Sequence, residues 1–100
     1  MIYLVGLSHK TAPVELRERL AFPEGRQAEV LKDLQGRTGL EEAVILSTCN
    51  RTEIYAVSDA PDAPDRIAAF LSWAREIPIE ELGDKLYRHG EPQSVLHLLR

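Results

Sequence analysis

The chain has 100 residues and a mass of 11.3 kDa, a length that suits one domain with a modest core. Apolar residues make up 44% and charged residues 28%, a globular composition that argues against disorder or a collagen-like chain. The net charge of −4 argues against general binding of nucleic-acid phosphate, so any RNA contact must be local or made by another domain. No apolar run approaches the ~20 residues of a membrane helix, and no secretory signal is evident, so we expect a cytoplasmic protein with no membrane partner.

The first forty residues predict one strand and two helices. Residues 2–7 are rich in strand formers and read as a short buried strand. A polar loop follows, and Pro13 introduces a short helix over 14–20. Residues 24–35 place apolar side chains on one helical face, and Gly36 is predicted to cap this second helix.

The middle of the chain predicts a hairpin followed by a helix. Residues 43–46 and 53–57 are apolar runs close in sequence, and such runs normally pair as neighbouring strands. The clearest helical periodicity begins at Pro64 or Asp65, and Pro78 ends it.

The last part predicts a fourth strand over 85–89 and a helix that begins after residues 90–92 and runs to Arg100. The element order is typical of an α+β, ferredoxin-like split βαβ fold: an antiparallel sheet with helices on one face, plus a trailing C-terminal helix. The stop inside a predicted helix favours a piece of a longer protein over a natural short protein.

Cys49 is the single cysteine, so no disulfide forms within the chain, which fits a reducing compartment. A free cysteine is most often a small buried side chain without reactivity. The neighbours of Cys49 favour a nucleophile, because Thr48 and residues 50–53 are all polar and the segment joins two apolar strands. In an extended chain the Arg51 guanidinium would lie near the sulfur and raise its thiolate fraction.

Arg51 itself has two readings. It is either a surface charge or ion pair with Glu53, worth less than about 1 kcal/mol, or a bidentate clamp for a substrate carboxylate. Thr48 and Asn50 would add hydrogen-bonding groups around such a ligand, or they simply serve the turn.

The histidines differ in position. At about 100° per residue, His97 lies roughly opposite the apolar stripe of the last helix. It is therefore expected to face water, which the spacing favours, or a second surface as a general acid/base near Cys49. His9 and His89 adjoin a polar loop and a turn, and we expect both to be exposed.

No metal or cofactor site is predicted within the chain. One cysteine and three scattered histidines show none of the usual metal-ligand spacings. The sequence also lacks a glycine-rich dinucleotide fingerprint and a phosphate-binding loop.

Two segments carry a family resemblance. Residues 6–13, Gly-Leu-Ser-His-Lys-Thr-Ala-Pro, and residues 47–55, Ser-Thr-Cys-Asn-Arg-Thr-Glu-Ile-Tyr, are together similar to the N-terminal catalytic domain of glutamyl-tRNA reductase. Residues 97–100, His-Leu-Leu-Arg, resemble the opening of a further signature of that family. Family members continue into a spinal helix, an NADPH-binding domain and a dimerisation domain. Residues 1–100 are therefore expected to be a single N-terminal catalytic domain, without the NADPH-binding and dimerisation domains.

The resemblance implies an NADPH-dependent oxidoreductase whose substrate is glutamyl-tRNA. Cys49 would attack the ester carbonyl and form a thioester, releasing the tRNA. NADPH, held by a domain outside residues 1–100, would reduce the thioester to glutamate-1-semialdehyde for tetrapyrrole, and hence porphyrin, biosynthesis. Thr48 and Arg51 would recognise the glutamyl group, His97 matches a functionally important histidine near the nucleophile, and the loop of residues 8–13 would line the pocket. A homodimer and transfer of the product to an aminomutase are also implied.

Three other classes remain. The main alternative is a non-catalytic ferredoxin-like module for ligand binding or regulation, in which Cys49 is buried and unreactive. An RNA-binding sheet needs exposed aromatic residues, for which Tyr3 and Tyr55 are candidates, and a basic face, which the net charge disfavours. A thiol protease is disfavoured because no local Cys/His motif occurs.

Overall fold

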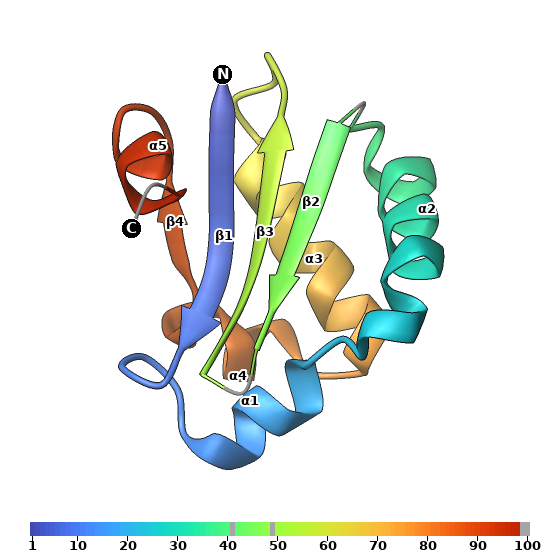
Figure 1. Ribbon diagram of the computed structural model, residues 1–100, viewed down its shortest axis with the longest axis vertical. Helices are drawn as coiled ribbons and strands as arrows, with labels where there is room; N and C mark the ends of the chain where they lie inside the picture. Colours follow the sequence, from blue (N-terminus) through green and yellow to red (C-terminus); the bar gives the residue numbers. More distant parts are fainter. Residues whose placement is uncertain (41, 49, 99–100) are drawn as a thin grey trace.

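A computed structural model describes residues 1–40, 42–48 and 50–98 and shows a four-stranded antiparallel sheet with helices (Figure 1). The elements are β1 (Ile2–Ser8), α1 (Val14–Leu20), the 3-10 helix η1 (Glu24–Arg26), α2 (Gln27–Thr38), β2 (Glu42–Ser47), β3 (Arg51–Val57), α3 (Ala63–Arg75), α4 (Ile79–Leu82), the 3-10 helix η2 (Gly83–Lys85), β4 (Tyr87–His89) and α5 (Gln93–Leu98). The strand order is β2-β3-β1-β4, and every neighbouring pair is antiparallel. The predicted split βαβ fold is confirmed.

The main core lies between the sheet and the helices. Successive side chains of a strand point to opposite faces, so Val5 and Leu7 of β1 share a face with Ile54 of β3. These residues are buried against apolar side chains of the helices, including Leu20 and Ile67. Figure 1 shows α3 crossing behind the sheet with α2 beside it. Within the described residues, no helix has the length and apolar character needed to cross a membrane.

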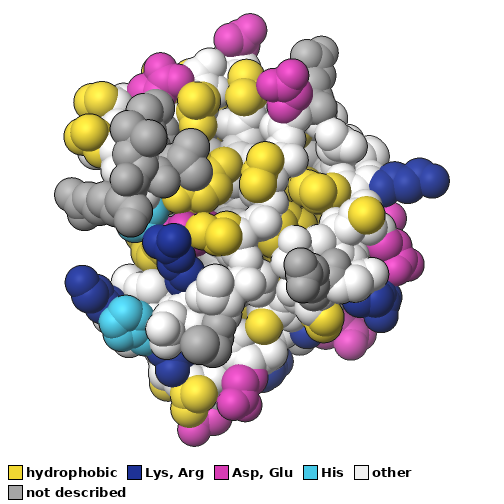
Figure 2. Space-filling view, viewed as in Figure 1, with side chains coloured by type: hydrophobic (Ala, Val, Ile, Leu, Met, Phe, Trp, Pro, Cys, Tyr) yellow, Lys and Arg dark blue, Asp and Glu magenta, His cyan; other side chains and the backbone are white. Residues whose placement is uncertain are grey.

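The opposite face of the sheet carries the polar features of the protein. Gly6 of β1 pairs with Glu53 of β3 on this face, and α5 lies against it through His97. Figure 2 shows hydrophobic side chains over the middle of the face that is turned toward the viewer. Val44 of β2 and Val57 of β3 are 62% and 43% exposed. The helices therefore cover one face almost completely, as predicted, while α5 takes part of the other.

One helix ends later than its glycine pattern predicts. The prediction that Gly36 caps α2 is wrong, because α2 continues through Gly36 to Thr38. The cap is Gly39, which has a φ of 74° in the left-handed region. Glycine adopts this conformation without a steric penalty, and helices commonly end in this way.

The remaining boundaries differ by short extensions. The strand predicted over 43–46 is longer by one residue at each end, and the strand predicted over 53–57 begins two residues earlier. Backbone pairing continues into the polar residues beside the turn. The fourth strand is shorter, since residues 83–85 form η2 and only 87–89 pair with β1. The four-residue helix α4 was not predicted, because so short an element carries no clear periodicity.

Candidate active site

A cavity of about 700 Å³ opens where β1 ends and β3 begins. It is lined by Ser8, His9, Lys10, Thr11, Thr48, Asn50, Arg51, Tyr87, His89 and His97. In Figure 2 dark blue and cyan side chains, which are Lys or Arg and His, gather toward the left of the same face. The cavity thus combines side chains from β1, β3, β4 and α5 with those of the loop after β1 and the turn before β3, and its lining includes the basic residues Lys10 and Arg51.

Four of the five predicted site residues line this cavity: Thr48, Asn50, Arg51 and His97. The fifth, Cys49, lies outside the described residues. It stands between Thr48 and Asn50 in the sequence. The structure therefore brings the predicted set together as far as it describes that set.

The turn between β2 and β3 is held by Thr48. Its hydroxyl oxygen accepts the backbone N–H groups of Asn50 and Arg51, each at 3.2 Å. The Thr48 N–H donates to the carbonyl of Arg51 at 2.8 Å. The hydroxyl of Thr48 thus serves the turn, which is the ordinary role of threonine at such a position.

The loop after β1 is attached directly to that turn. The His9 N–H donates to the carbonyl oxygen of Asn50 at 2.8 Å. Within the loop, the Thr11 hydroxyl accepts the Ser8 N–H at 3.0 Å, and the Ser8 carbonyl accepts the N–H of Thr11 at 3.0 Å. These bonds place His9 and Lys10 on the cavity rim beside residues 48–51, although the two segments are some forty positions apart in sequence.

Glu53 is the site residue that the sequence reasoning missed. Although all described neighbours of Cys49 are polar, Thr52 and Glu53 are core residues, with exposed fractions of 2% and 0%. The Glu53 carboxylate accepts hydrogen bonds from the hydroxyls of Tyr55 and Tyr87. The His97 ring contacts it from a third element, so polar partners from β3, β4 and α5 surround the buried side chain.

Gly6 makes room for this carboxylate. A Cβ atom at position 6 would lie 2.8 Å from Cγ of Glu53 and 2.6 Å from the carbonyl oxygen of Thr52. Glycine is the residue that permits so close an approach between neighbouring chain segments. The only sequence signal for the buried carboxylate is thus a glycine inside an otherwise apolar strand.

The two tyrosines beside Glu53 stay protonated over a wide pH range. Burial raises the pKa of Tyr55 to about 12, and the negative charge of Glu53 and its hydrogen bond add to the effect. Burial also raises the pKa of Tyr87 strongly, with the hydrogen bond to Glu53 as the next cause. Both hydroxyls are therefore hydrogen-bond donors to the carboxylate at any physiological pH.

His97 contacts the sheet rather than the solvent. Its Nε2 lies 2.6 Å from Oε2 of Glu53, and its side chain is 26% exposed. Its ring lies 5.5 Å from the ring of Tyr87 and 5.9 Å from that of His89, measured between centroids. The favoured expectation that His97 faces water is wrong, because α5 folds back onto the open face of the sheet and supplies the second surface.

The other two histidines also reach the cavity. His9 is exposed on the rim, as predicted. The expectation that His89 is exposed is wrong, because His89 is partly buried and its ring stacks on that of Tyr87 with 5.7 Å between centroids. The position of His89 next to a turn does not predict this contact.

Arg51 forms the ion pair with Glu53 that is one of its two predicted roles. Its Nη1 lies 3.7 Å from Oε1 of Glu53, and its side chain remains 37% exposed at the cavity. A guanidinium carries five N–H donors, so the exposed part of such a side chain is suited to an anionic ligand. Within the described residues, no group of three or more His, Cys, Asp or Glu side chains is arranged to hold a metal ion.

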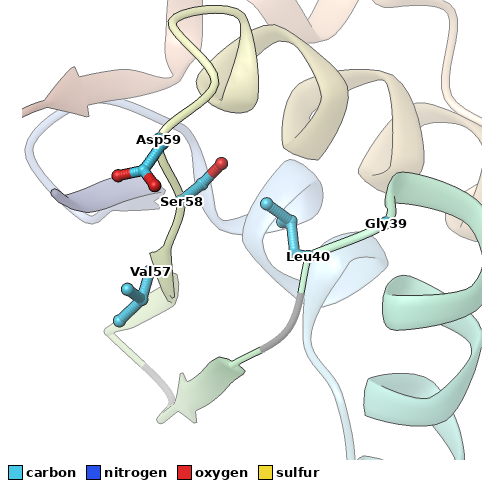
Figure 3. A pocket seen from close by; sticks show the side chains of 5 residues that line it. All are labelled: Gly39, Leu40, Val57, Ser58 and Asp59. Carbon is cyan, nitrogen blue, oxygen red and sulfur yellow. The ribbon is translucent and has the colours of Figure 1, made fainter.

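A second cavity, of about 220 Å³, lies at the opposite end of the sheet, and its described lining includes no His, Lys or Arg. It is lined by Gly39, Leu40, Val57, Ser58 and Asp59 (Figure 3). The carboxylate of Asp59 extends away from Leu40 in Figure 3 and lies 3.9 Å from the N-terminal amine. The larger cavity is therefore the candidate site.

The fold and the site define an α+β domain with a polar pocket, lined in part by basic side chains, at one end of an antiparallel sheet. Comparison with known proteins makes this assignment specific. The family described as "Glutamyl-tRNAGlu reductase, N-terminal domain" matches residues 5–100. The chain belongs to this family.

Individual relatives agree over the whole chain. Glutamyl-tRNA reductase of Desulforudis audaxviator is 44% identical over 100 residues, covering 100% of this chain and 22% of the relative. That of Rippkaea orientalis is 47% identical over 100 residues, covering 99% of this chain and 23% of the relative. The solved structure of glutamyl-tRNA reductase from Methanopyrus kandleri superimposes with a TM-score of 0.73 at 28% identity, covering 99% of this chain and 21% of that one. The chain thus spans less than a quarter of the length of these relatives.

Proposed function

We propose that this chain is the acyl-accepting part of a glutamyl-tRNA reductase, with Cys49 as the nucleophile. The observation that carries the proposal is the cavity, because it is lined by the residues on both sides of Cys49 and by Arg51 and His97. The family membership supplies the substrate: the relatives are named for glutamyl-tRNA. Their names describe proteins more than four times as long, so the substrate of this chain is part of the proposal.

The proposed step is a transfer of the glutamyl group to sulfur. The sulfur of Cys49 forms a bond to the acyl carbon, and the bond from that carbon to the terminal ribose oxygen of the tRNA breaks. The proton lost by the thiol goes to the leaving ribose oxygen, so that the step is balanced without an oxidant or reductant. His97 is proposed to move this proton, because it is a cavity residue with an ionisable ring.

Arg51 is proposed to bind the side-chain carboxylate of the glutamyl group. Its side chain is 37% exposed at the cavity, and arginine matches a carboxylate with two parallel hydrogen bonds. Asn50 and Thr48 line the same wall, so we propose that they complete the contact with the glutamyl group.

The reductive half of the reaction is assigned elsewhere. NADPH is the hydride donor that the family implies, and a thioester is an easier target for hydride than an oxygen ester. Residues 1–100 contain no glycine-rich turn of the kind that holds a dinucleotide. We therefore propose that residues 1–100 form one catalytic domain and that a separate domain completes the reduction to glutamate-1-semialdehyde, which serves tetrapyrrole synthesis. We further propose that the whole enzyme is a cytoplasmic homodimer and that it passes its product to an aminomutase.

The test is to incubate the 100-residue chain with glutamyl-tRNA and to search for a glutamyl adduct by mass spectrometry. The unchanged chain is expected to gain one glutamyl group on Cys49, and Cys49→Ser is expected to gain no thioester. An adduct that persists at another residue in Cys49→Ser would overturn the nucleophile. Formation of the semialdehyde after addition of NADPH would overturn the division of the reaction between domains.

A conservative variant tests the clamp. Arg51→Lys keeps the charge but loses the two parallel N–H groups, so the rate of acylation is expected to fall at least tenfold. Arg26→Lys is the matched control, because Arg26 is 67% exposed, forms an ion pair with Glu29 three residues on, and does not line the cavity. Equal rates for the two variants would contradict the proposed role of Arg51.

The same samples address the non-catalytic alternative. A structural thiol reacts slowly with a labelling reagent until the protein unfolds, whereas a nucleophilic thiolate reacts in the native state. We expect Cys49 to label rapidly without denaturant. Labelling that appears only in denaturant, together with an absence of adduct, would favour a ligand-binding module.

A further inference from the structure

Glu53 is a buried carboxylate that contacts two side chains of the cavity, which a purely structural role does not require. It is fully buried, yet its two oxygens receive contacts from β3, β4 and α5. The contact from α5 is His97, a cavity residue, and the contact from β3 includes Arg51, another cavity residue. The carboxylate therefore contacts His97 and Arg51, the two side chains for which the proposed function requires a proton transfer and a substrate contact.

The hydrogen-bond partners of Glu53 indicate how the protons are arranged. Tyr55 and Tyr87 both donate to the carboxylate. Nε2 of His97 lies 2.6 Å from Oε2 of Glu53, and an ionised carboxylate has no proton to give, so with Glu53 ionised Nε2 is the donor of this contact. In a neutral imidazole one nitrogen is a donor and the other is an acceptor, which leaves Nδ1 as the acceptor.

We infer that Glu53 is a positioning residue for His97: by accepting the Nε2 proton it fixes the tautomer and the ring orientation, so that Nδ1 is the nitrogen that exchanges a proton during acylation. The role of Nδ1 in acylation rests on the proposed function. The tautomer and ring orientation of His97 do not depend on the proposed function. The positioning role also explains why a charged residue is buried in β3 next to the turn. A carboxylate that orients an imidazole through its second nitrogen is a common arrangement in proton-transfer sites.

The substitution Glu53→Gln tests the inference with almost no change of shape. The amide replaces one oxygen by an N–H donor, so three donors then compete for a single acceptor oxygen. The tautomer of His97 is expected to become mixed. The rate of acylation by glutamyl-tRNA is expected to fall by about 10- to 100-fold, with little change in the glutamyl-tRNA concentration that gives half the maximal rate, because the substrate contacts remain.

Tyr55→Phe is the matched control, because Tyr55 contacts Glu53 but does not line the cavity. It removes the donor to Oε1 and leaves the carboxylate in place, so His97 keeps its acceptor Oε2. We expect this variant to retain the Nε2–H tautomer and to acylate within a few-fold of the unchanged chain. A merely structural role for Glu53 predicts instead that both variants lose activity together with folded protein.

The readout is the nitrogen NMR spectrum of the 15N-labelled 100-residue chain, recorded at about pH 8.5, above the range in which histidines ordinarily titrate. The unchanged chain is expected to show His97 protonated on Nε2 only. Protonation on Nδ1, or an unchanged tautomer and rate in Glu53→Gln, would overturn the inference. If Glu53→Gln does not fold, Glu53→Asp, which withdraws the carboxylate by one methylene, is measured in its place. An unchanged chain that shows the expected tautomer but forms no adduct would refute the proposed function and leave the placement of the proton intact.

Discussion

Replacing Gly6 by alanine is expected to destabilise the domain, although alanine adds only one methyl group. Gly6 pairs with Glu53 in the ladder between β1 and β3. The new Cβ would lie 2.6 Å from the carbonyl oxygen of Thr52 and 2.8 Å from Cγ of Glu53. Carbon atoms in contact normally stay about 3.5–4.0 Å apart. The oxygen belongs to the backbone of a central strand, so it cannot withdraw without distorting the ladder.

The magnitude follows from two opposing terms. Overpacking of a well-packed site costs about 1–3 kcal/mol, and the upper part of this range applies where backbone must move. Replacing glycine also reduces the entropy of the unfolded chain, which returns about 0.4–1 kcal/mol. The net loss is therefore about 1–2 kcal/mol. For a domain of this length such a loss lowers Tm by roughly 4–16 °C.

The assay is urea unfolding followed by circular dichroism, with Gly36→Ala as the control. Gly36 lies inside α2, where an added Cβ meets nothing within 4 Å. Alanine is the better helix former by about 0.8–1 kcal/mol, so this variant is expected to be more stable than the unchanged chain. The two glycine-to-alanine changes are thus predicted to have opposite signs.

A Gly6→Ala chain whose midpoint equals or exceeds that of the unchanged chain would refute the reasoning. It would show that β1 and β3 separate easily at this point and that the close approach of Gly6 to Glu53 is not required. Because the same clash displaces Cγ of Glu53, a stable Gly6→Ala chain would also remove one support for a fixed carboxylate behind His97.

Two further predictions concern the core and the tyrosines. Ile67→Ala is expected to lower the free energy of unfolding by about 2–4 kcal/mol, because Ile67 is fully buried. Ile79→Ala, at a side chain that is 40% exposed, is expected to lose less than about 1 kcal/mol, and equal losses in urea unfolding would contradict the described core. The pKa of Tyr55 is raised from about 10 to about 12 in the folded state. Tyr55 therefore makes a contribution to the free energy of unfolding that is present below about pH 10 and is lost as pH rises through about 12. The unchanged chain should therefore lose more stability over that window than Tyr55→Phe, and parallel losses would rule out the raised pKa.

The architecture follows from local patterns that the sequence carries openly. Strand formers in residues 2–7 and 43–46, the helical periodicity after Pro64, and the prolines between them predict the element order and hence the split βαβ fold. The polar segment around Cys49 predicts the turn between two buried strands, and residues of this turn line the larger cavity. Each of these signals lies within a few residues of the feature that it predicts.

The burial of Glu53 and the orientation of His97 could be known only from the tertiary structure. The donors that make a buried carboxylate acceptable come from Tyr87 and His97, which are 34 and 44 positions away in the sequence. A helical wheel describes α5 relative to its own apolar stripe, whereas the direction of His97 depends on which face of the sheet α5 meets. Long-range contacts of this kind override local pattern, because a polar group is stable wherever its hydrogen bonds are satisfied.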